Sequence, residues 1–172
     1  MAPVIFITGG ARSGKSRLAE RLAGSFGMPL GYVATGAAGD GEMAARIARH
    51  RQRRGDAWTT IEEPMELAAA LRENDGRFAA VLVDCITLWL TNLLLAYDDS
   101  TRCLDQVKEL TAVFPHLATP IILVSNEVGM GIVPENRLAR RFRDLAGEAN
   151  EMIAAAADEV HVTFSGIPLR LK

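Results

Sequence analysis

The sequence predicts a three-layer α/β domain with a mostly parallel sheet, and three observations support this prediction. Short apolar runs rich in β-branched residues recur along the chain, at 4–8, 79–84 and 120–125. Several of the segments between them have the length and the apolar spacing of helices. Strands that alternate with helices form parallel sheets, because each crossover helix returns the chain to the same end of the sheet. The 172 residues contain no internal repeat, low-complexity tract or linker, so we expect a single domain over 1–172.

The first half of the chain is expected to begin with the strand at 4–8, which reaches a glycine pair, and a helix from Lys15. A second strand is predicted at 29–35, and a helix from Glu42 to about Arg54. The elements that follow are a strand at 58–64 that ends at a proline, a helix over 65–71 and the continuous apolar run at 79–84, which is typical of a buried parallel strand.

The second half is expected to start with an apolar helix at 86–96. The polar segment 98–101 is predicted to be a loop, an amphipathic helix is predicted at 104–114, and 120–125 is a further buried strand. The remaining predicted elements are a glycine-bearing loop at 126–136, a long helix from Pro134 or Glu135 to Ala157, a strand at 159–164 and a closing hairpin with 167–172.

Composition and charge are those of a globular protein, with 49% hydrophobic and 23% charged residues. A net charge of −2 gives no overall attraction to nucleic acid, so we expect no nucleic-acid partner. Two cysteines without a CxxC pair and three histidines predict neither a disulfide nor a zinc cluster. The amino terminus lacks the features of a signal peptide, and the longest apolar stretch, 85–96, is shorter than the ~20 residues of a membrane span. We therefore expect a cytoplasmic protein.

The segment from Gly9 to Ser16 matches the phosphate-binding pattern G-x-x-x-x-G-K-[ST] between a predicted strand and a predicted helix. Glycines allow backbone N–H groups to turn toward phosphate oxygens, and the start of the helix adds a favourable field. Lys15 is expected to bridge the β- and γ-phosphates. A chance glycine-rich turn is the alternative. The predicted nucleotide-binding residues of this P-loop are Gly9, Gly10, Ala11, Arg12, Ser13, Gly14, Lys15 and Ser16.

Asp84 closes the buried strand at 79–84. In a P-loop enzyme an aspartate at this place holds Mg²⁺, directly or through water, together with the P-loop hydroxyl. An aspartate in this position would by itself be read as a helix cap or a turn residue. Because it occurs together with the P-loop, we predict a Mg²⁺ site formed by Ser16 and Asp84.

A basic helix is predicted around His50, where Arg46, Arg49, His50 and Arg53 fall on one face at i, i+3, i+4 and i+7. Such a face is commonly a solvated surface. Here the neighbouring arginines disfavour the imidazolium form, so His50 would tend to stay neutral and nucleophilic. A neutral imidazole can attack an α-phosphate and form a phosphoramidate, which divides one nucleotidyl transfer into two steps.

Two polar residues, Asn126 and Glu127, follow the strand at 120–125 directly. They are expected at the carboxyl edge of the sheet, where α/β proteins bind ligands, and this position favours a functional role. Most charged residues of the following helix are expected to form ordinary surface ion pairs.

Several segments together resemble one enzyme family. They are GGARSGKS, YVATG, DGEMAARIARHR, WTTIEEP, VLVDCITLWLTNLL and SNEVGMGIVPENRLARRFRDLAGEANE. Over essentially the whole chain, the sequence is similar to the bifunctional adenosylcobinamide kinase/adenosylcobinamide-phosphate guanylyltransferases of cobalamin biosynthesis. The resemblance implies a RecA-like P-loop fold, a homotrimer and two reactions. Adenosylcobinamide would be phosphorylated with ATP or GTP, and GMP would then pass from GTP through a guanylylated histidine to give adenosylcobinamide-GDP and diphosphate.

The resemblance also implies roles for individual residues. Lys15 would act in the kinase step, and His50 would be the guanylylated nucleophile. Some members of the family carry two adjacent histidines at this point, whereas this chain has Arg49 beside His50. The further nucleotide contacts that the resemblance implies are Val33, Ala34, Thr35, Arg51, Gln52, Arg53, Arg54, Glu62 and Asp84.

Two other functions remain open at this point. One is a P-loop small-molecule kinase without nucleotidyl transfer, in which His50 is a surface residue. The other is a regulatory RecA-like ATPase whose oligomer binds nucleic acid, which the lack of net positive charge and of an aromatic–basic run disfavours.

Overall fold

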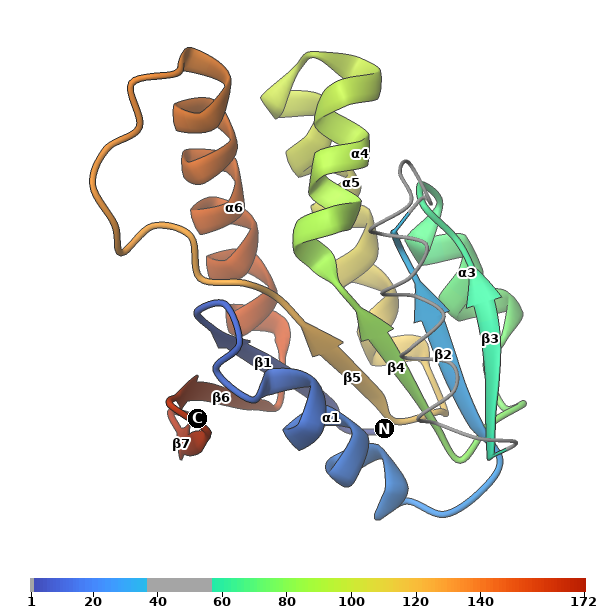
Figure 1. Ribbon diagram of the computed structural model, residues 1–172. Coiled ribbons are helices and arrows are strands. Elements are labelled where there is room, and N and C mark those ends of the chain that lie inside the picture. Colours follow the sequence, from blue (N-terminus) through green and yellow to red (C-terminus); the bar gives the residue numbers. More distant parts are fainter. Residues whose placement is uncertain (1, 37–56) are drawn as a thin grey trace.

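The computed structural model describes residues 2–36 and 57–172, and this part of the chain forms one seven-stranded sheet (Figure 1). In chain order the strands are β1 (Val4–Gly9), β2 (Leu30–Ala34), β3 (Trp58–Glu62), β4 (Ala80–Asp84), β5 (Ile121–Val124), β6 (Glu159–Phe164) and β7 (Ile167–Arg170). Across the sheet their order is β3-β2-β4-β5-β1-β6-β7. The first six strands pair in parallel, and β7 pairs antiparallel with β6 at one edge. The predicted mostly parallel sheet and the closing hairpin are therefore confirmed.

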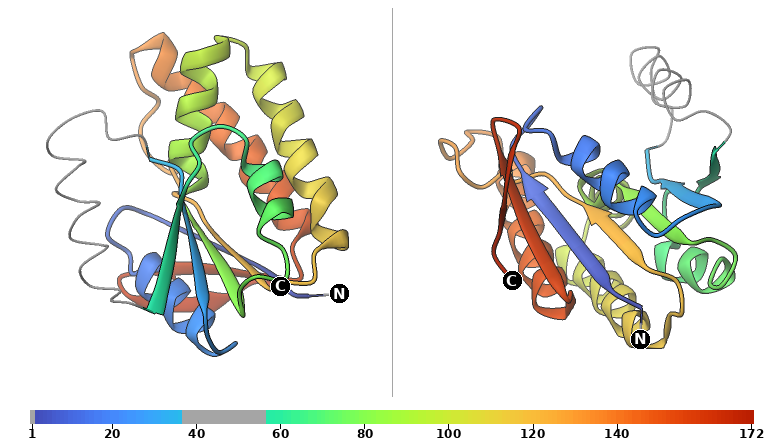
Figure 2. Two further views of the ribbon diagram at one scale, coloured as in Figure 1. Left: turned by 90° about the vertical axis from the view of Figure 1, so that its right-hand side faces the viewer. Right: turned by 90° about the horizontal axis from the view of Figure 1, so that it is seen from below.

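Helices cover both faces of the sheet and complete three layers (Figures 1 and 2). Among the described residues, helix α1 (Lys15–Gly24) packs on one face. The helical elements that pack on the opposite face are α3 (Leu67–Glu73), α4 (Ile86–Tyr97), α5 (Ser100–Val113), the short 3-10 helix η2 (Phe114–His116) and α6 (Arg137–Ala156).

Strand β1 shows why the central strands read as continuous apolar runs. Successive side chains of a strand point to opposite faces of the sheet. Ile5 and Ile7 accordingly join the core beneath α1, with Leu18 of that helix. Val4 and Phe6 belong to the larger core on the other face. Both faces of the strand are buried, and apolar residues are therefore needed at every position.

The start of α5 differs from the prediction. The helix begins at Ser100 and not at 104, so the segment 98–101, predicted to be a loop, is partly helical. The side chain of Asp99 accepts hydrogen bonds from the backbone N–H groups of Thr101 and Arg102, at 2.8 and 3.4 Å. A polar segment of this kind can form a helix cap as well as a loop, because its side chains can accept hydrogen bonds from the unpaired N–H groups of the first helical turn.

The start of α6 also lies later than predicted, at Arg137 and not at Pro134 or Glu135. Asn136 sets this start, because its side chain accepts a hydrogen bond from the backbone N–H of Ala139 at 3.0 Å. The helix predicted from 42 to 54 lies outside the described residues. Within the described part of the chain, every helix is too short or too polar to cross a membrane.

Candidate nucleotide-binding site

The P-loop connects β1 to α1 and requires glycine at two points. Gly9 has a φ of 148°, and a Cβ added to it would lie 2.5 Å from the carbonyl oxygen of Thr163. Gly14 has a φ of 101°, and its Cβ would lie 3.2 Å from Cα of Gly166. Both positions therefore combine a backbone conformation that favours glycine with a close approach of the β6–β7 hairpin. The two glycines of the motif are required by this structure itself, independently of any ligand.

Lys15 is the first residue of α1, and only 7% of its surface is exposed. Its Nζ donates a hydrogen bond to the carbonyl oxygen of Gly10 at 2.6 Å, which holds the ammonium group across the loop. The first N–H groups of a helix carry partial positive charge, and Lys15 lies at this N-terminal end of α1. A cation and a helix N-terminus are thus brought to one point, which is the electrostatic arrangement that an anionic phosphate requires.

Ser16 and Asp84 are brought together from α1 and β4, as predicted. Ser16 Oγ donates a hydrogen bond to Asp84 Oδ2 at 3.3 Å. A hydroxyl and a carboxylate are hard oxygen donors, and Mg²⁺ commonly binds one or two such protein groups and takes its remaining ligands from phosphate and water. The described residues contain no cluster of three or more His, Cys, Asp or Glu side chains that could hold a metal by itself. The donor set fits Mg²⁺ bound together with a nucleotide.

The carboxyl ends of three neighbouring strands place Glu62, Ala34 and Asp84 side by side. In the register of the sheet, Ala34 is paired with Glu62 on one side and with Asp84 on the other. These three predicted residues therefore lie at one level, at the edge of the sheet where ligands bind in α/β folds.

The side chains of Val33 and Thr35 are buried in the interior of the protein. Val33 is fully buried in the core. Thr35 Oγ1 donates to the carbonyl oxygen of Cys85 at 2.7 Å and accepts from the backbone N–H of Cys85 at 2.9 Å. Asn92 Nδ2 donates to the carbonyl oxygen of Thr35 at 2.8 Å. Thr35 therefore links the end of β2 to the end of β4.

Cys85 follows Asp84 directly and is buried. Burial, and secondarily the charge of Asp84, raise the pKa of the Cys85 thiol to about 11. At neutral pH the thiol is therefore protonated and a poor nucleophile, although it lies next to the site.

The β6–β7 hairpin contacts and supports the P-loop, and the sequence analysis did not predict this contact. Ser13 Oγ and Thr163 Oγ1 lie 2.6 Å apart, and both residues are buried. The backbone N–H of Gly166 donates to the carbonyl oxygen of Ser13 at 2.8 Å. The turn at Ser165–Gly166 was visible in the sequence, but no local signal shows that β6 pairs with β1 and so meets the P-loop.

A hollow of about 310 Å³ opens beside the P-loop. It is lined by residues 9–13 of the loop, by Glu127 and Met130 from the segment after β5, and by residues 162–165 of the hairpin. Glu127, which the sequence placed at the carboxyl edge, thus reaches the same space as the P-loop.

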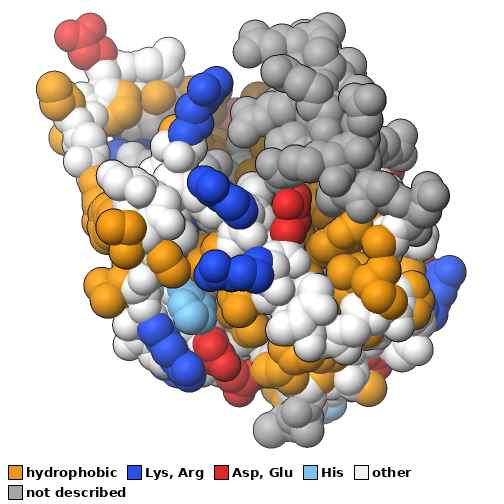
Figure 3. Space-filling model, turned by 60° about the horizontal axis from the view of Figure 1, so that its bottom comes forward, with side chains coloured by type: hydrophobic (Ala, Val, Ile, Leu, Met, Phe, Trp, Pro, Cys, Tyr) orange, Lys and Arg blue, Asp and Glu red, His pale blue; other side chains and the backbone are white. Residues whose placement is uncertain are grey.

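Positive charge is available locally, although the chain has a net charge of −2. Arg12 of the P-loop and Arg17 and Arg21 of α1 are exposed. Figure 3 shows Lys and Arg side chains gathered near the middle of the face that it presents. Local clusters of this kind attract a polyphosphate without an overall positive charge.

The predicted nucleophile lies in a part of the chain for which the structure gives no geometry. His50 and its neighbours Arg51, Gln52, Arg53 and Arg54 all lie outside the described residues. The basic face and the role of His50 stay predictions.

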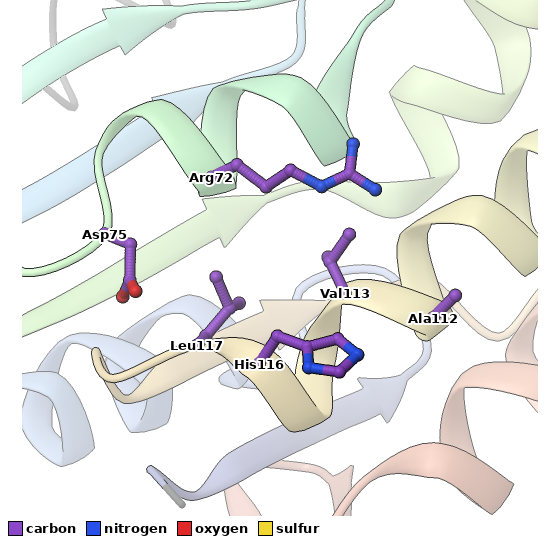
Figure 4. A pocket seen from close by; sticks show the side chains of 6 residues that line it. All are labelled: Arg72, Asp75, Ala112, Val113, His116 and Leu117. Atoms are coloured by element: carbon purple, nitrogen blue, oxygen red, sulfur yellow. The ribbon is translucent and has the colours of Figure 1, made fainter.

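A second hollow, of about 400 Å³, lies at the opposite edge of the sheet, near the connections that lead into β4 and β5 (Figure 4). Arg72 Nη1 lies 3.4 Å from Glu109 Oε1, and the Asp75 carboxylate accepts hydrogen bonds from the backbone N–H groups of Ala118 and Thr119. Burial acts to raise the pKa of Asp75, but these hydrogen bonds outweigh it and lower the pKa. The Arg72–Glu109 pair thus joins α3 to α5, and Asp75 joins the loop after α3 to the loop before β5.

The chain matches a family model over residues 5–171, and that model is described as cobinamide kinase / cobinamide phosphate guanyltransferase. The chain belongs to this family. A bifunctional adenosylcobalamin biosynthesis protein, CobP, from Pseudomonas aeruginosa is 52% identical over 96% of this chain and 95% of its own length. Proteins called CobU, with the same bifunctional description, are 45% identical in Salmonella typhimurium and 43% identical in Escherichia coli, each over 98% of this chain and 99% of their own lengths. The family predicted from the sequence is confirmed.

Solved structures with a similar fold are more distant in sequence. The flagellar accessory protein FlaH from Methanocaldococcus jannaschii matches with a TM-score of 0.55 at 16% identity, over 99% of this chain and 78% of that protein. The RadB recombinase matches with a TM-score of 0.50 at 16% identity, over 94% of this chain and 74% of that protein. At such identities the likeness shows the fold alone, and it confirms the RecA-like P-loop architecture that the resemblance implied.

Proposed function

We propose that this chain carries out two successive reactions on one corrinoid substrate. The first is phosphorylation of the aminopropanol hydroxyl of adenosylcobinamide by ATP or GTP. The second is transfer of GMP from GTP to the resulting phosphate, with release of diphosphate. Membership of the cobinamide kinase/guanyltransferase family supports the pair of reactions. The observation that carries the proposal is the P-loop itself, in which Lys15 crosses the loop and Ser16 faces Asp84.

In the kinase step, the P-loop residues would act mainly by charge and position. Phosphoryl transfer spreads negative charge over the oxygens of the transferred group, and preorganised donors stabilise that charge. Lys15 and the N–H groups at the start of α1 would provide these donors. Ser16 and Asp84 would hold Mg²⁺, which supplies further charge neutralisation on the phosphates when it is bound. Glu62 and Ala34 lie at the same level of the sheet and would contact the nucleotide from the side.

In the second step, His50 would be the nucleophile. A neutral imidazole nitrogen attacks the α-phosphorus of GTP, the bond to the β-phosphate breaks, and diphosphate leaves. The phosphate of the acceptor then attacks the same phosphorus and releases the histidine. The neighbouring arginines, Arg51, Arg53 and Arg54, would neutralise the phosphates during both displacements.

The test is to incubate the protein with α-³²P-GTP and Mg²⁺ and to compare three variants. The wild-type protein should acquire acid-labile, alkali-stable label. His50→Ala should acquire none and still phosphorylate adenosylcobinamide, whereas Lys15→Ala should lose phosphorylation. His116→Ala, which changes a histidine of η2 beside the other hollow, is the matched control and should label like the wild type. Absence of label in the wild type, or loss of both activities in His50→Ala with the fold intact, would contradict the proposed division of roles.

We also propose a homotrimer in the cytoplasm. Phe164, Ile167, Leu169 and Leu171 of the terminal hairpin region are between 53% and 72% exposed, and such an apolar edge favours association. Both cysteines are free and buried, as expected in a reducing compartment. Light scattering that gives the mass of one chain at micromolar concentration would refute the trimer.

A further inference from the structure

The segment that follows β5 is fixed firmly against the P-loop. The backbone N–H of Asn126 donates to Thr87 Oγ1 at 2.7 Å, and its carbonyl oxygen accepts from Asn150 Nδ2 at 3.3 Å. The backbone N–H of Glu127 donates to the carbonyl oxygen of Gly9 at 2.9 Å. Glu127 is therefore held on a rigid base that is joined directly to the first glycine of the P-loop.

Glu127 is one of the residues that line the hollow beside the loop. Among the described residues that line this hollow, Glu127 is the one that carries a carboxylate. Its Oε1 accepts a hydrogen bond from the backbone N–H of Gly129 at 3.2 Å, whereas Oε2 makes no hydrogen bond to any described residue. Asp84, the predicted metal ligand, is instead engaged by Ser16. One carboxylate oxygen of Glu127 thus remains available, in a residue that lines the hollow next to the P-loop.

An alcohol needs such a group when it accepts a phosphoryl group, because its proton must leave as the new bond forms. We propose that Glu127 is the general base of the kinase step. The hydroxyl oxygen of the acceptor forms the bond to the γ-phosphorus, the bond from that phosphorus to the β-phosphate oxygen breaks, and the hydroxyl proton passes to Glu127. The products are the phosphate ester, the nucleoside diphosphate and a protonated Glu127, which returns its proton to water. This inference rests on the proposed function, since it assigns a residue to its first reaction.

The second reaction makes no such demand. Its acceptor is a phosphate ester, which is already ionised at neutral pH and attacks without losing a proton. The loss of a base at Glu127 should therefore affect the first reaction and leave the second unchanged, whereas the loss of a residue that only supports the structure should affect both.

The experiment uses Glu127→Gln in the full-length protein, with each step assayed separately. Glutamine retains an oxygen that can accept the Gly129 N–H, so the turn is preserved while the base is removed. We expect kcat for phosphorylation of adenosylcobinamide to fall by about 10²–10⁴. The dissociation constant for the nucleotide and guanylyl transfer to pre-formed adenosylcobinamide phosphate should each stay within about twofold of the wild type. Glu127→Asp should recover part of the kinase activity. Glu135→Gln, an exposed glutamate of the same loop, is the matched control and should match the wild type in both steps.

Three results would overturn the assignment. Unchanged phosphorylation by Glu127→Gln would show that no proton passes to this residue. An equal loss of both reactions would show that Glu127 only supports the P-loop. Recovery of the kinase at high Mg²⁺ would make Glu127 a metal-binding group. Failure of the proposed function looks different, because the wild-type protein would then phosphorylate no adenosylcobinamide at all.

Discussion

The contact between Ser13 and Thr163 gives a direct test of how the P-loop is held. The two hydroxyl oxygens are 2.6 Å apart, and the residues are 7% and 1% exposed. Thr163→Val removes one hydroxyl, keeps the shape of the side chain and leaves the Ser13 hydroxyl without this partner. A buried hydroxyl that loses its partner costs about 1–3 kcal/mol of unfolding free energy. Ser13→Ala should cost a similar amount for the same reason.

The double variant distinguishes this interaction from unrelated packing losses. With both hydroxyls removed, neither is left unsatisfied, so the double variant should be little less stable than either single variant. Urea unfolding followed by tryptophan fluorescence, with the fully buried Trp89 as a reporter, should therefore give a coupling energy of about 1–3 kcal/mol. Thr163→Val should also weaken nucleotide binding, and Thr163→Ser should restore it. Additive effects within about 0.5 kcal/mol would refute the reasoning, because two residues that share one buried hydrogen bond cannot act independently.

Two further predictions concern carboxylates at opposite edges of the sheet. Asp84→Asn should raise the Mg²⁺ concentration needed for half-maximal phosphorylation by at least tenfold while the circular dichroism spectrum is unchanged; an unaltered Mg²⁺ dependence would remove Asp84 from the metal site. The lowered pKa of Asp75 means that its contribution to stability is present above its unfolded value of 3.8 and is lost as the pH falls through the lower folded value. The free energy of unfolding should therefore fall between pH 5 and about pH 2. This fall should be smaller in Asp75→Asn and unchanged in the neighbouring variant Glu73→Gln. If the unfolding free energy has the same slope against pH in the wild type and both variants, the hydrogen bonds from Ala118 and Thr119 are not the source of the fall.

The parts of the site that the sequence predicted are those with a local pattern. The P-loop is eight consecutive residues between a strand and a helix, and Asp84 ends a continuous apolar run, so both were recognisable without any knowledge of the fold. The meeting of Ser16 with Asp84 then followed from the general arrangement of P-loop proteins, and the structure confirms it. The brace from Thr163 could not be predicted, because it joins residues 150 positions apart through the pairing of β6 with β1.

Errors at the helix boundaries have a different cause. The segment 98–101 was predicted to be a loop because it is polar, yet Asp99 uses that polarity to cap α5. Asn136 does the same for α6. Capping residues and loop residues have the same composition, since both satisfy backbone groups that lack a regular partner. Composition alone therefore predicts that a helix boundary occurs in such a segment, whereas the capping hydrogen bonds determine at which residue the helix begins.

Gly9 links the P-loop to the segment that carries the proposed base, Glu127. Its carbonyl oxygen accepts the N–H of Glu127, and its Cα faces the backbone of Thr163 too closely for any side chain. The strand after which Glu127 stands and the hairpin that braces the loop are thus both positioned against the same residue. In the proposed scheme this fixes the γ-phosphate relative to Glu127 in the first reaction, while His50 would attack the α-phosphate of a further GTP molecule in the second. For these two reactions the chain would supply two groups: the carboxylate of Glu127, which takes the proton of the substrate's alcohol, and the imidazole of His50, which attacks the α-phosphate.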